Sequence, residues 1–259
     1  MSKIIVSILC MLMICSATNI SYSQKKAEGK TMDWTTKSAE AKMFATSGAN
    51  HLMNVELALA YADFMSAIKL DPDFTVALTF LSNLTRGATQ KSFSQRAQKS
   101  AANKTEGEKL FASLTEENMT QERRRDIWGK LHTMYPDGGM IGHYYVVTRA
   151  TPDERLTAAQ EYNKKFPNNP AMYNTIAYYY LNDKKNNAKA KENFDKYLSL
   201  YPDGYNPYDS MGEYYLLTGD VENASKYYSL ALEKYPFNES SIIALEKIEN
   251  DKKKGEVKK

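Results

Sequence analysis

The chain has 259 residues, of which 25% are charged, and its 34 Lys and Arg nearly balance its 31 Asp and Glu, for a formal net charge of +3. This balance argues against a nucleic-acid-binding protein, which presents an excess of basic residues to phosphates. Proline and glycine are sparse, at 8 and 12 residues, and no long run alternates apolar with polar residues, so the composition favours an all-helical soluble protein.

An export signal is predicted at the N-terminus. Lys3 precedes the apolar stretch 4–15, which is too short to span a bilayer. The small residues Ser21 and Ser23 frame a cleavage site before Gln24, as in secretory signal peptides. We therefore expect the mature chain to begin near Gln24.

Cleavage there removes residues 1–23 and leaves residues 24–40 as an N-terminal linker. The junction resembles export signals of Bacteroidetes-type bacteria, which places the product in the periplasm. Both cysteines, Cys10 and Cys15, lie within the signal, so the mature protein has no disulfide and no cysteine ligand for a metal. A lipoprotein acylated at Cys15 is the less favoured alternative, because the bulky Ile14 precedes it where a small residue is preferred.

Prolines mark a repeating unit further along the chain. Five of them end amphipathic runs and are separated by 64, 31, 35 and 34 residues, the first interval being close to two periods: Pro72, Pro136, Pro167, Pro202 and Pro236. A period near 34 is typical of a helical repeat in which two antiparallel helices form one unit. Since proline lacks an N–H, it ends the second helix of each unit.

Small and aromatic residues recur at fixed places inside these units. Two units share the offsets 0, 12, 16, 19 and 24: Gly48, Ala60, Phe64, Ala67 and Pro72 in one, and Gly212, Ala224, Tyr228, Ala231 and Pro236 in the other. We predict that Gly48 faces Ala60 across the helix pair, so that the two axes approach closely, and that Phe64 fills the space between units. The same roles are predicted for the second set.

At these positions the sequence resembles the tetratricopeptide repeat family. The resemblance covers most of the chain and is weaker in its middle, where Arg124 and Arg155 stand in place of a small residue. It implies an all-α fold, a right-handed superhelical solenoid of antiparallel helix pairs. We expect a capping helix at 239–250 and a disordered basic tail at 251–259. The six units are expected at about 41–74, 75–104, 105–137, 138–169, 170–204 and 205–238.

In such a solenoid the first helices of the units line a concave groove, which in related proteins holds an extended peptide or a helix. The groove is expected to be polar, and Asp209 and Glu213 make its C-terminal end acidic. These two acids replace basic positions of the clamp with which some family members capture a chaperone C-terminus, so that ligand is not expected. The helical phase predicts that the groove is lined by Asn83, Arg86, Met140, His143, Asn174, Thr175, Tyr178, Asn206, Asp209 and Glu213.

The sequence shows no pattern typical of catalysis or of cofactor binding. The chain has three histidines, His51, His132 and His143, and no two of them have the i, i+4 spacing that would place both on one helical face for a metal. It has no glycine-rich phosphate loop and no nucleophile elbow. We therefore expect no catalytic residue, no cofactor and no metal.

The sequence thus predicts an exported scaffold that binds a protein or peptide partner in its concave groove, without catalysis and without nucleic acid. Association with the envelope and self-association through the outer faces are compatible with this interpretation. The first alternative is a glycan-binding accessory protein that uses exposed tyrosines and asparagines. It requires the rings of Tyr144, Tyr179 and Tyr214 to be coplanar and exposed. An enzyme of unrecognised type is the third interpretation.

Overall fold

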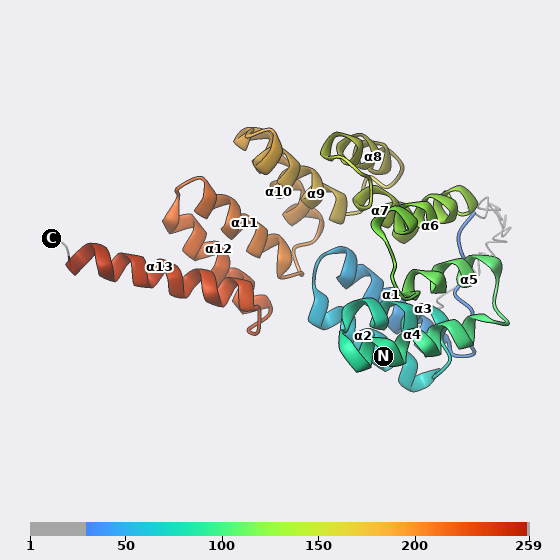
Figure 1. Cartoon of the computed structure of the whole chain (residues 1–259). Coiled ribbons are helices and arrows are strands. Elements are labelled where there is room, and N and C mark those ends of the chain that lie inside the picture. The colour runs from blue at the N-terminus through green and yellow to red at the C-terminus, as the bar shows by residue number, and fades with distance from the viewer. Residues whose placement is uncertain (1–29, 258–259) are drawn as a thin grey trace, which may run out of the picture.

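The computed structural model describes residues 30–257, so the expected signal at 1–23 and the lipidation alternative at Cys15 lie outside the described residues. Within 30–257 every regular element is helical (Figure 1). The elements are α1 (Ala39–Met53), α2 (Leu57–Leu70), α3 (Thr75–Leu84), α4 (Gly87–Ala101), α5 (Glu106–Ala112), η1 (Ser113–Thr115), α6 (Gln121–Met134), α7 (Gly139–Val147), α8 (Pro152–Lys165), α9 (Ala171–Tyr178), η2 (Tyr179–Asp183), α10 (Asn187–Leu200), α11 (Asn206–Leu217), α12 (Val221–Lys234) and α13 (Glu239–Val257).

Successive helices pack in pairs, from α1 with α2 to α11 with α12, and α13 packs on α12. The chain is therefore an all-α helical solenoid, and each expected unit contains one helix pair. Figure 1 shows the pairs along an arc, with α13 at the end farthest from α5 and α6. Within the described range, no helix combines the length and the apolar character needed to cross a bilayer.

The C-terminal helix is longer than the sequence predicted. α13 begins at Glu239, where the cap was expected, but it continues to Val257. The prediction of a disordered tail from residue 251 is therefore wrong as far as Val257. Ion pairs one helical turn apart explain the extension, because Lys253 Nζ lies 2.7 Å from Glu249 Oε1, and such pairs stabilise a helix.

The first helix pair crosses closely at a glycine. A Cβ on Gly48 would lie 3.0 Å from the ring of Phe64, so the ring of Phe64 lies nearest to the glycine. The ring of Phe64 also stacks on Phe80 of α3, with centroids 4.7 Å apart. Phe64 therefore fills the space between the first two units, as predicted.

The fourth pair differs from the regular ones. In the sixth pair a Cβ on Gly212 would lie 2.7 Å from the ring of Tyr228. In the fourth, the ring opposite Gly142 belongs to Tyr162, about one helical turn further along its helix. α8 also carries Arg155 where the regular units have alanine. This shift explains why α7 and α8 pack less extensively than α11 and α12.

Contacts between distant units close the solenoid on itself. The turn between α1 and α2 is hydrogen-bonded to the segment that joins α10 to α11, across 145 to 150 residues of sequence. The extended segment before α1 is also held, because Glu108 of α5 accepts a 2.9 Å hydrogen bond from the backbone N–H of Thr35. The contacts of the α1–α2 turn hold the first unit against the fifth and sixth units, so the surfaces between them are not free to bind a partner.

Candidate functional site

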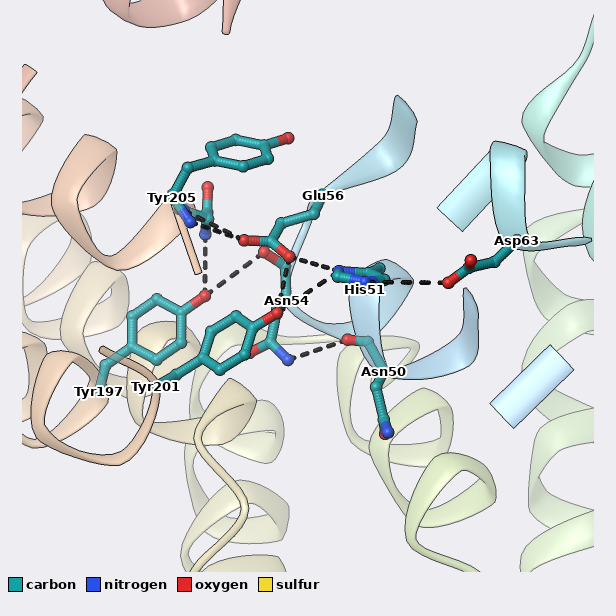
Figure 2. A network of polar contacts seen from close by, with 9 residues as sticks. Asn50, His51, Asn54, Glu56, Asp63, Tyr197, Tyr201 and Tyr205 are labelled. Carbon is teal, nitrogen blue, oxygen red and sulfur yellow. Dashed lines mark hydrogen bonds and ion pairs between the residues drawn. The ribbon is translucent and has the colours of Figure 1, made fainter. Parts of the chain in front are cut away.

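The contact that closes the solenoid centres on one buried carboxylate (Figure 2). Glu56 is fully buried and accepts hydrogen bonds from the Tyr201 hydroxyl at 2.7 Å and from the backbone N–H of Tyr205 at 2.9 Å. His51 Nδ1 lies 2.6 Å from the same carboxylate. We call this network, from residues 51–56 to residues 197–206, the closure contact.

Local backbone geometry presents Glu56 to its partners. The preceding residue, Val55, has a φ of +63°, a left-handed conformation that is unfavourable for a β-branched side chain. The hydrogen bond with Glu56 is the main reason why the pKa of His51 is raised, and burial of the ring opposes it. An unpaired charge is costly in the protein interior, so the donors around Glu56 are needed to stabilise its buried carboxylate. This arrangement indicates a structural role for Glu56.

A second set of bonds in the closure contact surrounds Tyr197, which is fully buried. Its hydroxyl donates to the backbone carbonyl of Asn54 at 3.4 Å and accepts from Asn206 Nδ2 at 3.1 Å. Burial raises the pKa of Tyr197 well above its usual value. Asn206 is thus used inside the protein and does not face a groove.

Half of the predicted groove residues are buried, so their expected exposure to a ligand is wrong. His143 is 6% exposed, and its burial lowers the pKa of the imidazole to about 3. Asp209 accepts hydrogen bonds from Asn238 and from Ser241 and thereby holds the start of α13. The buried members are Met140, His143, Asn174, Asn206 and Asp209.

The other predicted groove residues form two groups, Asn83 with Arg86 at the turn from α3 to α4, and Thr175 and Tyr178 of α9 with Glu213 of α11. Asn83 lines a polar cleft of about 620 Å³ beside α4, while Arg86 is exposed. Thr175 and Tyr178 line a small cleft of about 250 Å³ next to α8. The Tyr178 hydroxyl donates to Glu213 at 2.6 Å. The ten residues therefore do not form one continuous groove, because five of them are buried and the other five form two separate groups.

The tyrosines of the glycan alternative are packed rather than free. Tyr144 stacks on Trp128 with centroids 4.7 Å apart, and burial raises its pKa well above the usual value. Tyr179 is 7% exposed, and Tyr214 is half-buried against Phe194. The condition of coplanar and exposed rings is not met.

A large cleft lies where the third unit meets the irregular fourth unit, lined by residues of α6, α7 and α8. Its volume is about 1140 Å³. We call it the α6–α8 cleft. Its walls combine rings and aliphatic groups with charged groups: His132, Pro136, Gly142, Tyr145, Val146, Arg149, Thr151, Asp153, Glu154, Thr157, Ala158, Glu161, Tyr162, Lys164, Lys165 and Phe166.

One tyrosine organises the polar part of the α6–α8 cleft. The His132 ring stacks on Tyr145 with centroids 4.3 Å apart, and the guanidinium carbon of Arg149 lies 4.0 Å from the same ring centroid. Arg149 Nε donates to the Tyr145 carbonyl at 2.9 Å. Arg149 Nη2 and His132 Nδ1 are buried without a hydrogen-bond partner, which leaves binding capacity at the wall.

The charges around this cluster favour a neutral imidazole. The pKa of His132 is lowered, first by burial and then by the positive charges of Lys165 and Arg149. A neutral imidazole has one donor and one acceptor nitrogen, so the unpartnered Nδ1 of His132 can take either role. Elsewhere in the described range, no three His, Cys, Asp or Glu side chains gather in an arrangement that would hold a metal.

The acidic side chains at the rim of the cleft are already engaged. Glu154 accepts from the backbone N–H of Ala150 at 3.0 Å, as the cap of α8. Asp153 lies 3.1 Å from Lys184 Nζ, and Glu161 lies 2.6 Å from Lys164 Nζ. Within residues 30–257 none of these carboxylates forms an ion pair with Arg149.

Sequence reasoning did not identify the residues of this cleft. It gave no binding role to His132, Tyr145 or Arg149. The available signal was Arg155, which breaks the small-residue pattern in the same unit. A departure of this kind predicts looser helix packing, and looser packing leaves room for a cleft.

No protein-family model and no curated protein sequence matches this chain. Solved tetratricopeptide repeat proteins resemble it in structure at low identity. PilW, a type IV pilus biogenesis factor, is 12% identical with a TM-score of 0.43, over 80% of this chain and 99% of that one. PilF of Pseudomonas aeruginosa is 12% identical with a TM-score of 0.44, over 82% and 97%. Cut9 in the APC/C Cut9–Hcn1 complex is 14% identical with a TM-score of 0.49, over 81% of this chain and 42% of that one.

Proposed function

We propose that this protein is an exported scaffold that binds a protein or peptide partner in the α6–α8 cleft. The observation that carries the proposal is the unused binding capacity of this cleft, where Arg149 and His132 keep unpartnered nitrogens beside apolar walls. Concave surfaces with a few convergent polar groups are the usual form of binding sites. A solenoid suits this role, since each unit adds surface without requiring a larger core.

Two further parts of the proposal rest on the sequence. Export to the periplasm rests on the predicted signal at residues 1–23. The absence of catalysis rests on the sequence, which contains no glycine-rich phosphate loop, no nucleophile elbow and no histidine pair spaced for a metal. The predicted groove is not the proposed binding surface, because five of its ten residues are buried.

Site-specific crosslinking in the envelope of the source organism tests this proposal. A photo-crosslinking amino acid is placed at Thr157, which is exposed and lines the cleft, and at Glu192 of α10 as a matched exposed control. We expect a partner protein to be crosslinked from position 157 and not from 192. Equal crosslinking from both positions, or none from 157, would contradict the proposal. A crosslink to a second copy of this chain would make self-association the function of the cleft.

A further inference from the structure

We propose that the α6–α8 cleft recognises a carboxylate on its peptide partner, and that Arg149 is the residue that binds it. This inference rests on the proposed function and adds the chemistry of the partner. The carboxylate comes from an acidic side chain or from a peptide C-terminus, and the experiment below separates these two sources.

The first argument is the unfilled hydrogen-bonding capacity of Arg149. Among the described residues only its Nε has a partner, the Tyr145 carbonyl, and Nη2 is buried without one. Leaving such a group unpaired costs about 1–3 kcal/mol, and more when it is charged. The guanidinium is held over the Tyr145 ring by a cation–π contact and by its Nε hydrogen bond, and a planar guanidinium can bind a carboxylate with two parallel hydrogen bonds.

The second argument is the balance of charge in the cleft. Its cations Arg149, Lys164 and Lys165 are matched in number by the carboxylates Asp153, Glu154 and Glu161. A dianion such as a phosphate would meet the repulsion of those carboxylates. Lys164 and Lys165 already have acidic partners, whereas Arg149 has none among the described residues. A group with one negative charge can therefore pair with Arg149.

The third argument is the apolar wall beside the guanidinium. Val146, Tyr162 and Phe166 line the cleft with apolar groups, and the first two are buried. The Lys165 ammonium lies 5.9 Å from the Phe166 ring centroid. A partner residue next to the carboxylate would bury apolar surface there, so the expected motif is an acidic group adjacent to an apolar side chain.

Peptide pools provide the test, with the chain from Gln24 onward immobilised. All pools contain random apolar residues. The first has one Asp or Glu and an amidated C-terminus, the second has no acidic side chain and a free C-terminus, and the third has neither carboxylate. We expect the first or second pool to be retained and the third to be lost. The pool retained identifies the source of the carboxylate, while retention of all pools alike, or of none, overturns the inference.

Variants of the cleft sharpen this test. Arg149→Gln should weaken binding of the retained pool at least about tenfold, and Arg149→Lys should weaken it less because the charge remains. Arg123→Gln is the matched control, since Arg123 is exposed and paired with Glu116 outside the cleft. It should bind as the native chain does. Unchanged binding by Arg149→Gln would overturn the inference.

A measurement on the native chain covers the case in which Arg149→Gln folds poorly. A bound carboxylate should raise the pKa of His132, observed by NMR of the imidazole, because a nearby negative charge favours the protonated ring. No change in the His132 titration on adding a retained peptide would overturn the inference. The two proposals can fail separately. A lack of carboxylate selectivity would contradict only the role of Arg149, and a crosslink from position 157 would still support the scaffold. Absence of that crosslink would contradict the scaffold function.

Discussion

The closure contact and the α6–α8 cleft both place a charged group against tyrosine rings, but they differ in how completely that group is hydrogen-bonded. Glu56 has a hydroxyl, backbone N–H groups and an imidazole around its carboxylate. Arg149 has one partner for a guanidinium that carries five donors. A satisfied buried charge holds a structure together, and an unsatisfied one is available to a ligand. The comparison assigns stability to the first region and binding to the second.

Removal of the buried carboxylate should have the largest effect on stability. Glu56→Ala leaves the Tyr201 hydroxyl and two backbone N–H groups without an acceptor, and we expect a loss of about 3–5 kcal/mol in the free energy of unfolding. Glu161→Ala, at the exposed rim of the cleft, should change it by less than about 0.5 kcal/mol. Chemical denaturation measures both. Equal effects of the two variants would contradict the comparison.

The closure contact can also be disturbed through its backbone. A Cβ on Gly204 would collide with the Tyr201 ring and lie 2.8 Å from Glu56 Oε1. Gly204→Ala should therefore destabilise the fold by about 1–3 kcal/mol. Gly129 of α6 has open space around it, so Gly129→Ala should stabilise by about 0.5–1 kcal/mol. A thermal unfolding series compares the two, and destabilisation by both substitutions to the same extent would argue against this packing.

The stability contributed by His51 should depend on pH. Because its pKa is raised in the folded protein, chiefly by Glu56, its contribution is fully present below the unfolded value of 6.5 and is lost as pH rises through the folded-state pKa. The difference in unfolding free energy between native and His51→Gln chains should be larger at about pH 6 than at about pH 9. A difference that is constant or grows with pH would contradict the role given to Glu56.

The smallest effect on stability is expected in the cleft. Arg149→Gln removes a buried nitrogen that has no partner, which favours folding, but also the Nε hydrogen bond to the Tyr145 carbonyl, which opposes it, so the free energy of unfolding should change by only about 0.5 kcal/mol or less. Calorimetry of the ligand-free chain measures this change. A loss as large as that of Glu56→Ala would show that Arg149 is structural, and the contrast between the two regions would disappear.

The sequence was sufficient to predict the helix pairs, because the Gly48, Phe64 and Pro72 positions report contacts within one unit. It was not sufficient for the site. Asn206 and Asp209 have the correct helical phase for a groove, yet Asn206 is buried beside the distant Glu56 and Asp209 is buried against the start of α13. Glu56 carries no local pattern that could indicate partners 145 residues away. Periodicity describes the surface of one unit and does not describe how a solenoid closes.

The most direct test of the account is hydrogen exchange on the chain from Gln24 onward, alone and with the partner captured from position 157. The account predicts new protection in the last turns of α6 and along α8. It also predicts that residues 197–206 are already protected without the partner and do not change, because the closure contact stays formed. New protection at 197–206 with none in α8 would contradict the account. It would indicate that the partner binds at the concave side instead.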